Sequence, residues 1–239
     1  MNINFAGSVV VVAGGTGGLG MAVSRAFLEE GAKVIVTYRK AEELRALKDS
    51  AGPQASRLEG RQVDVTDEAA TAEFIGGILA QHGALDVLVN TVGGYVGGVK
   101  LWDVTLKVLD QMLALNLRSG FTLARAVMPA MLKAGHGSII NVAAKAAFDH
   151  GSGAAAYAAS KAAAVALMDS LAADAKGTGV RVNSILPSII DTAANRLAMP
   201  DSDYASWPKP EDIAQVVLFL SSELAKTIHG AAVPVYGGD

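Results

Sequence analysis

The sequence predicts an α/β protein built as a single doubly wound parallel sheet with helices on both faces. Three observations support this fold class. Short β-branched apolar runs alternate with segments of helical spacing along the whole chain, which is typical of βαβ units. Hydrophobic residues make up 51% of the 239 residues, enough to bury a sheet on both faces. No linker, tandem repeat or low-complexity segment divides the chain, so we expect one domain over residues 1–239.

Strands are predicted where short apolar runs end in turn residues. The expected strands span residues 9–13, 33–38, 61–65, 85–90, 138–142, 180–186 and about 233–236. Apolar residues spaced by three or four predict helices at 19–30, 41–51, 67–81, about 102–132, 155–176 and 211–222. Gly31 and Gly52-Pro53 close the first two helices, and Pro129 is expected to bend the fourth. The segment 191–210, which is rich in proline, is expected to form a mobile flap.

The composition argues against several classes of protein. The net charge is −3 with both signs interspersed, so a nucleic-acid surface is not expected. The absence of cysteine excludes disulfides and cysteine-ligated zinc. The first residues lack a signal-peptide pattern, and no apolar run approaches the ~20 residues of a membrane span, so we expect a soluble cytoplasmic protein. The histidines lack metal-ligand spacing, so we expect surface or capping roles and no metal site: His82, His136, His150 and His229.

A glycine-rich turn follows the first predicted strand and opens the first predicted helix. Its sequence, Gly14-Gly15-Thr16-Gly17-Gly18-Leu19-Gly20, satisfies both the G-x-G-x-x-G and the G-x-x-x-G-x-G spacing. Glycines let the backbone turn tightly and approach a pyrophosphate, which then sits on the helix N-terminus. The sequence therefore predicts a Rossmann-like dinucleotide site, with a ligand-free glycine turn as the alternative.

The end of the second predicted strand indicates which nicotinamide cofactor is preferred. An acidic residue there binds the ribose 2′-hydroxyl of NAD, whereas a basic residue accommodates the 2′-phosphate of NADP. The sequence reads Tyr38-Arg39-Lys40 and has no acid at the turn. Arg39 can pair with a phosphate through two hydrogen bonds, so NADP(H) is favoured over NAD(H). The alternative is that Arg39 and Lys40 only begin a solvated helix.

Tyr157 and Lys161 form the most informative pair of polar residues. Positions i and i+4 lie on one face of a helix, so the lysine ammonium can reach toward the phenol and the cofactor ribose. A phenol titrates near pH ~10, and a neighbouring cation together with the positive oxidised nicotinamide would favour phenolate. We expect Tyr157 to act as the acid/base group.

Several motifs in order resemble the short-chain dehydrogenase/reductase family. They are the glycine turn, Asp64-Val65, Asn90-Thr91-Val92-Gly93, Asn116, Tyr157-Ala158-Ala159-Ser160-Lys161, and Pro187 followed by Thr192. The resemblance covers essentially the whole chain and implies catalytic roles for Tyr157 and Lys161, with Asn116 anchoring a proton-relay water. For Asn116 alone, a buried helix asparagine bonded to backbone is the alternative. The resemblance also implies a homodimer or homotetramer built on the two long helices.

The resemblance implies one further set of residues, those that contact the cofactor. They are Gly14, Thr16, Gly17, Gly18, Leu19, Gly20, Tyr38, Arg39, Asp64, Val65, Asn90, Gly93, Tyr157, Lys161, Pro187, Ile190 and Thr192.

One position departs from the family pattern. The family places a serine 13 residues before the tyrosine, where it bonds the substrate oxygen, and this chain has Ala144 there. Ser152 and Ser160 are possible replacements, although neither occupies that position. The quinonoid dihydropteridine reductases form a branch of the family that lacks this serine. Three segments resemble that branch: residues 93–98, residues 144–149 and the flap. Two features do not resemble that branch: Asn116 is typical of the general family, and the Tyr38-Arg39 turn does not resemble that of an NAD-preferring pteridine reductase.

Three functions remain open from the sequence. The leading one is an NADPH-dependent reductase of a small carbonyl or a quinonoid, pterin-like compound. The second is a general ketone or 3-oxoacyl reductase that replaces the lost serine, and the third is a weakly catalytic NADP-binding regulator. Ala144, Tyr95 and Trp207 are the candidate substrate residues, since aromatic rings can stack on a flat substrate, with packing as the alternative for the tryptophan. Asp149 and His150 are expected to be solvated loop residues.

Overall fold

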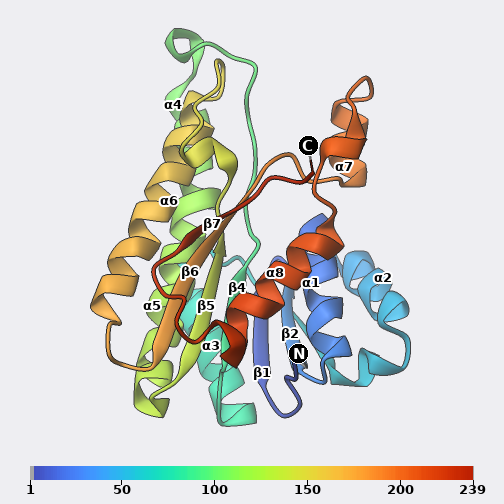
Figure 1. The fold of residues 1–239 in the computed structure, drawn as a ribbon, viewed down its shortest axis with the longest axis vertical. Coiled ribbons are helices and arrows are strands. Elements are labelled where there is room, and N and C mark those ends of the chain that lie inside the picture. Colours follow the sequence, from blue (N-terminus) through green and yellow to red (C-terminus); the bar gives the residue numbers. More distant parts are fainter. Residues whose placement is uncertain (1–2, 239) are drawn as a thin grey trace.

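A parallel sheet forms the centre of the protein. The computed structural model describes residues 3–238, and in that part of the chain seven strands lie in the order β3-β2-β1-β4-β5-β6-β7 (Figure 1). The strands are β1 Val9–Ala13, β2 Lys33–Tyr38, β3 Leu58–Gln62, β4 Val87–Asn90, β5 Gly137–Val142, β6 Val180–Pro187 and β7 Ala232–Val235. All neighbouring pairs are parallel. The predicted fold class is therefore confirmed.

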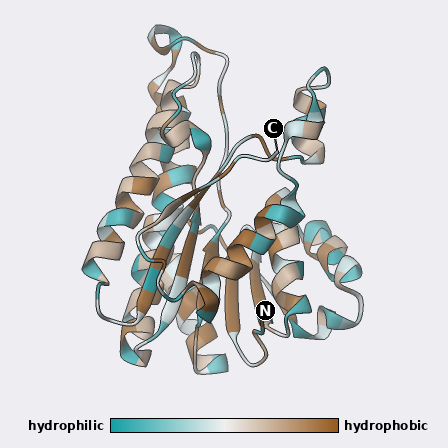
Figure 2. Cartoon of the chain, in the orientation of Figure 1, coloured by the Kyte–Doolittle hydropathy of each residue, from teal (hydrophilic) through white to brown (hydrophobic). Residues whose placement is uncertain are grey.

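Helices cover both faces of the sheet (Figure 1). Their bounds are α1 Gly18–Glu29, α2 Ala41–Ala51, α3 Glu68–His82, α4 Leu106–Leu113, α5 Ser119–Ala134, α6 Ala155–Asp174, α7 Ala193–Ala198 and α8 Pro210–Ser221. Side chains alternate between the faces along each strand, so Val10 and Val12 pack with α1, α2 and α8. Val9 and Val11 pack on the other face with α3, α5 and α6. Figure 2 shows this arrangement as strongly hydrophobic strands enclosed by helices with hydrophilic outer positions.

The third strand lies three residues earlier than the sequence indicated. The expected range was 61–65, but β3 is Leu58–Gln62 and pairs with β2 from Val34–Leu58 to Tyr38–Gln62. A 3₁₀ turn at Gly52–Arg57 brings the chain to the sheet earlier than expected. Asp64 then leaves the strand because its Oδ1 accepts hydrogen bonds from the backbone N–H and hydroxyl of Thr66.

The long helix expected at 102–132 is interrupted. Leu101–Asp103 is a separate 3₁₀ turn, α4 begins only at Leu106, and a π-helical segment at Ala114–Arg118 separates α4 from α5. Pro129 lies inside α5, which continues to Ala134. The π segment contains the buried Asn116, and such segments are frequent at functional sites. The periodicity of apolar residues did not reveal this insertion.

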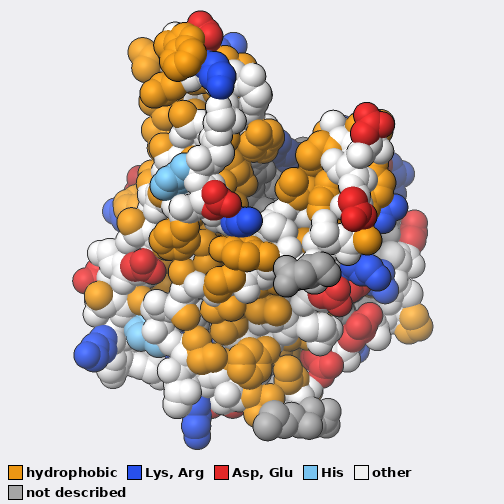
Figure 3. All heavy atoms as spheres, turned by 45° about the horizontal axis from the view of Figure 1, so that its top comes forward, with side chains coloured by type: hydrophobic (Ala, Val, Ile, Leu, Met, Phe, Trp, Pro, Cys, Tyr) orange, Lys and Arg blue, Asp and Glu red, His pale blue; other side chains and the backbone are white. Residues whose placement is uncertain are grey.

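The segment expected to be a flap stands above one end of the sheet. It contains α7 and a 3₁₀ turn at Tyr204–Ser206, and Asp191 N donates to Pro208 O at 3.0 Å to close its base. Figure 3 shows the surface hollowed between this segment and the other raised part of the molecule, with hydrophobic side chains on both sides. In residues 3–238 there is no helix with both the length and the apolar composition needed to span a membrane.

Candidate active site

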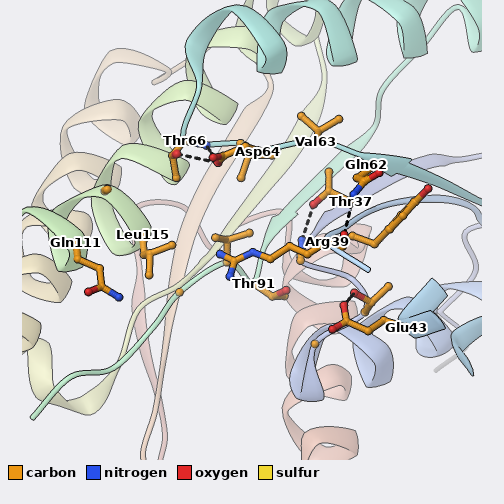
Figure 4. Close-up of a pocket in the computed structure, with 18 residues that line it drawn as sticks. Thr37, Arg39, Glu43, Gln62, Val63, Asp64, Thr66, Thr91, Gln111 and Leu115 are labelled. Atoms are coloured by element: carbon orange, nitrogen blue, oxygen red, sulfur yellow. Dashed lines mark hydrogen bonds between the residues drawn. The ribbon is translucent and has the colours of Figure 1, made fainter. Parts of the chain in front are cut away.

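A cavity of about 740 Å³ lies at the carboxyl ends of the strands, where the strand order reverses between β1 and β4 (Figure 4). This crevice is where open α/β sheets bind their ligands. Four loops line it, those that follow β1, β2, β3 and β4, together with residues of α4 and the π segment. The lining residues are Gly14, Thr16, Gly17, Thr37, Tyr38, Arg39, Glu43, Gln62, Val63, Asp64, Val65, Thr66, Thr91, Val92, Gly93, Gln111, Ala114 and Leu115.

The glycine turn has the geometry that a dinucleotide requires. Gly14 has a φ of +73°, which favours glycine. A Cβ on Gly20 would lie 2.1 Å from Gly14 O, so helix α1 can approach the turn this closely only with glycine there. Gly17, the residue before α1, is exposed and has no side-chain cap. The free N–H groups of the first helical turn can therefore bind a pyrophosphate.

The structure places eight of the predicted cofactor residues in the cavity wall. They are Gly14, Thr16, Gly17, Tyr38, Arg39, Asp64, Val65 and Gly93. Hydrogen bonds from Thr66 lower the pKa of Asp64, the backbone N–H contributing most, so this carboxylate stays ionised at neutral pH. The side chain of Arg39 extends from the end of β2 across the cavity (Figure 4).

The other predicted cofactor residues do not line the cavity. Thr192 is close to the glycine turn, since a Cβ on Gly18 would lie 2.8 Å from its Cγ2. Asn90 is buried, and its Nδ2 donates to Asn141 Oδ1 at 3.0 Å, so this side chain joins β4 to β5. Leu19 and Gly20 are buried in α1, Pro187 ends β6, and Ile190 packs against the core.

Tyr157 and Lys161 lie one turn apart on α6, as expected. Lys161 is buried and its Nζ donates to Val142 O at 2.9 Å. A Cβ on Gly93 would lie 3.2 Å from this ammonium, which therefore reaches the edge of the cavity. In the part of the chain that the structure describes, the Tyr157 hydroxyl makes no hydrogen bond.

The pKa values of the pair differ from the sequence-based expectation. Burial raises the pKa of Tyr157 to about 12, with a smaller contribution from Tyr95, and burial lowers the pKa of Lys161 to about 8. The lowering of the tyrosine pKa expected from Lys161 is not found: the raised pKa comes first from burial, which penalises the phenolate, and then from Tyr95. At neutral pH Tyr157 holds its proton, which suits a proton donor.

Asn116 joins three segments of the site. Its Nδ2 donates to Gly94 O at 3.0 Å and to Ser160 Oγ at 2.9 Å, and its Oδ1 accepts from Gly94 N at 2.9 Å. Ser160 Oγ in turn donates to Tyr157 O at 2.7 Å. The side chain is thus bonded to backbone, as the alternative interpretation held, and it fixes the loop after β4 to α6.

The two serines that could replace the missing hydroxyl at Ala144 are engaged in other hydrogen bonds. Ala144 is buried at the end of β5. Ser160 is fully buried and its hydroxyl is committed to Asn116 and Tyr157 O. Ser152 is exposed and its Oγ accepts from Lys100 Nζ at 2.7 Å. Both hydroxyls that the sequence offered as possible replacements thus already have partners elsewhere.

The two aromatic substrate candidates have different surroundings. Tyr95 is 64% exposed, and its ring meets that of Tyr157 edge-on. Trp207 is only 9% exposed and packs against Tyr204, with 4.9 Å between ring centroids. Tyr95 therefore offers an exposed aromatic surface beside Tyr157, whereas Trp207 mainly stabilises the flap.

Residues outside the recognised motifs complete the cavity wall. Thr37 Oγ1 accepts from Gly14 N at 2.8 Å, and Thr91 Oγ1 donates to Ala13 O at 2.7 Å, so both hold the glycine turn against the sheet. Thr37 follows from its place at the end of β2, at the edge where ligands bind. Glu43, on the first turn of α2, carried no such signal.

The histidines take structural positions. His136 Nε2 bonds Asp86 Oδ1 at 2.9 Å, which is the main reason that the pKa of this exposed imidazole is raised. His82 lies between Lys33 and Glu59 and its side chain is 4% exposed, so it is more covered than expected. His150 and His229 bond backbone carbonyl groups. In residues 3–238 no group of three or more acidic or histidine side chains has the arrangement of a metal site.

The fold, the glycine turn and the pair on α6 together define a nicotinamide-dependent oxidoreductase of the Rossmann type. The profile of the short chain dehydrogenases matches residues 8–203. The chain belongs to the short-chain dehydrogenase/reductase family.

The similarity to known relatives and solved structures covers nearly the full chain. The chain is 33% identical to D-threitol dehydrogenase of Mycolicibacterium smegmatis, over 97% of this chain and 92% of that protein. It is 32% identical to the 3-oxoacyl-[acyl-carrier-protein] reductase FabG of Escherichia coli, over 99% and 98%. A short-chain type dehydrogenase/reductase from Mycobacterium ulcerans superimposes with a TM-score of 0.92 at 26% identity, over 98% and 90%. Each of these relatives is an oxidoreductase or a member of the same fold.

Proposed function

We propose that the protein is an NADPH-dependent reductase of a small carbonyl or quinonoid, dihydropteridine-like compound. The observation that carries the proposal is the arrangement around Tyr157. A protonated phenol lies beside the exposed ring of Tyr95, and Ala144 lies where the family serine would hold a substrate oxygen. A quinonoid ring regains conjugation on reduction, so it depends less than a simple ketone on a donor that stabilises an oxyanion.

The residues present fit a nicotinamide dinucleotide. The first turn of α1 would hold the pyrophosphate, Arg39 the adenosine ribose, and Lys161 the nicotinamide ribose. When bound, the cofactor would supply a hydride, and Tyr157 would donate its hydroxyl proton. With a carbonyl compound the carbon gains the hydride and the oxygen the proton, so C=O is replaced by a C–H and an O–H bond. With a quinonoid compound the hydride and the proton are added at the two ends of the conjugated system, so both new bonds can be to nitrogen or oxygen while the double bonds shift and the ring becomes conjugated. Asn116 keeps the loop after β4 and α6 in register.

The general carbonyl reductase is the second candidate, and the relatives favour it. D-threitol dehydrogenase and 3-oxoacyl reductase are named for alcohol and 3-oxoacyl chemistry, and both match along nearly the whole chain. Such a reaction would need a donor in place of Ala144. We further propose a homodimer or homotetramer, since Phe121 and Leu132 of α5 are large hydrophobic residues that remain 46% exposed.

A panel of substrates tests the proposed function. Loss of NADPH absorbance is followed with quinonoid dihydropterin, quinones, short ketones and a 3-oxoacyl thioester. Efficient turnover of the quinonoid compounds with slow turnover of ketones supports the proposal. Efficient reduction of ketones or the thioester, with no activity on quinonoid dihydropterin, would establish the second candidate instead.

A further inference from the structure

Glu43 places a carboxylate in the cavity next to the glycine turn. It lies on the first turn of α2, and its Oε2 accepts a hydrogen bond of 3.0 Å from Thr16 Oγ1. Both residues line the cavity, and Figure 4 shows the dashed bond at Glu43 on the α2 side. The N-terminal turn of a helix favours negatively charged side chains, so an acidic residue is well placed at this position.

The side chains that line the cavity carry more negative than positive charge, which is unfavourable for binding an additional phosphate group. Among the described lining residues, Arg39 is the single basic side chain, whereas Glu43 and Asp64 are both acidic. Lys40, the other basic residue of the turn, is exposed and does not line the cavity. Arg39 has no salt bridge within residues 3–238, so its charge is available to a ligand. The two carboxylates in the same cavity, however, repel an anionic ligand that Arg39 would attract.

We infer that Glu43 is a specificity-determining residue that opposes Arg39: it accepts a hydrogen bond from the ribose 2′-hydroxyl of NAD(H) and repels the 2′-phosphate of NADP(H). The inference about Glu43 rests on one part of the proposed function, namely that the cavity binds the adenosine half of a nicotinamide cofactor. The 2′-phosphate carries close to two negative charges, and its repulsion by a carboxylate in a partly buried site exceeds that between surface groups. A free 2′-hydroxyl instead donates to a carboxylate, a charge-assisted hydrogen bond. The protein should therefore bind both cofactors, with a smaller preference for NADP(H) than Arg39 alone would produce.

Glu43→Gln isolates the charge from the hydrogen bond. The amide oxygen of glutamine can still accept from Thr16 Oγ1, so the loop keeps its tie to α2 while one negative charge is lost. Glu42→Gln is the matched control, because Glu42 lies on the same turn, is exposed and does not line the cavity. Binding of NADP⁺ and NAD⁺ is measured by calorimetry without substrate, so turnover does not enter the result.

We expect Glu43→Gln to tighten NADP⁺ binding by about 3- to 10-fold and to weaken NAD⁺ binding by about 2- to 5-fold. The gain in NADP⁺ affinity should shrink in 0.5 M salt, because screening weakens the charge interaction. Glu42→Gln should leave both affinities within about twofold. Equal changes for the two cofactors, or no change, would overturn the inference, since Glu43 would then only hold Thr16. A different result tests the proposed preference for NADPH: that proposal is wrong if the unmodified protein binds NAD⁺ more tightly than NADP⁺.

Discussion

The ring of Tyr95 meets the ring of Tyr157 edge-on, with 4.9 Å between centroids and 83° between planes. The side chain of Tyr95 lies over Gly97, where a Cβ would come within 2.0 Å of its hydroxyl oxygen. Glycine at 97 is thus required for this position of the ring. Because edge-to-face pairs stabilise a defined orientation, Tyr95, on the loop after β4, holds the ring of Tyr157, the proposed proton donor, in place.

Removal of the Tyr95 ring should slow turnover, whereas removal of its hydroxyl should not. We expect Tyr95→Ala to lower kcat about 3- to 10-fold, because an aromatic pair of this geometry contributes about 0.5–1.5 kcal/mol. Tyr95→Phe keeps the ring and should stay within about twofold of the unmodified protein. Steady-state kinetics with the best substrate of the panel measure both variants. A loss of the same size in Tyr95→Phe would show that the hydroxyl, rather than the ring contact, is important.

Tyr157→Phe should remove turnover while leaving cofactor affinity nearly intact. The substitution deletes the proton but keeps the ring against Tyr95, and positioned proton transfer contributes ~100- to 10,000-fold in rate. Cofactor titration and single-turnover reduction separate the two effects, with Tyr95→Phe as a matched loss of a phenol hydroxyl. Retention of most of the activity would contradict the acid/base assignment.

Lys161→Met should make the protein more stable at neutral pH but inactive. The folded protein lowers the pKa of Lys161 from 10.5 to about 8, so the unfolded chain binds more protons between these values and the free energy of unfolding rises with pH there. The cost of the buried ammonium is fully present below about pH 8. Methionine removes it but leaves Val142 O without its donor, so we expect a net gain of about 1–3 kcal/mol at pH 7.

Urea unfolding at pH 7 and pH 9.5 measures this effect. The advantage of Lys161→Met should shrink at the higher pH, where the lysine of the folded protein is largely neutral. A variant that is less stable than the unmodified protein at pH 7 would show that the buried lysine stabilises the fold.

Ala144→Ser should raise the reduction of ketones more than the reduction of quinonoid compounds. The new hydroxyl would donate to a developing oxyanion, and the loss of such a donor typically costs ~100- to 1000-fold in rate. We expect a gain of about tenfold or more in kcat/KM for ketones. Ala146→Ser, on the 3₁₀ turn that follows, is the control for adding a hydroxyl nearby. If the serine variant gains nothing on ketones, the alanine does not account for substrate choice.

Much of the fold follows from local patterns in the sequence, and the exceptions have physical causes. β2 and α2 have the bounds that the sequence predicts. Buried β-branched residues define β2 locally, and the glycine after Ala51 ends α2. The position of β3 depends on pairing with β2, which the charged and polar residues around Arg61 do not reveal. The π segment contains Asn116, which bonds Gly94 and Ser160, and the spacing of apolar residues cannot indicate contacts between residues so distant in sequence.

The candidate site also has features that local sequence patterns predict and others that depend on the tertiary structure. The glycine turn and the Tyr157–Lys161 pair are recognisable because their spacing is fixed by one turn or one helix. The raised pKa of Tyr157 could not be predicted, because it depends on burial by the tertiary structure. Glu43 enters the cavity only through the packing of α2 beside the glycine turn, and a glutamate on a helix carries no signal of that contact.

The bonds of Asn116 have a consequence for mutational libraries. Because one amide joins the loop after β4 to α6, substitutions at Asn116, Ser160 and the loop share partners, and their effects should not add. A scan of single variants would assign the whole loss to each position in turn. Improved variants of this region will therefore depend on the order in which changes are introduced, and paired libraries should reach combinations that stepwise selection does not.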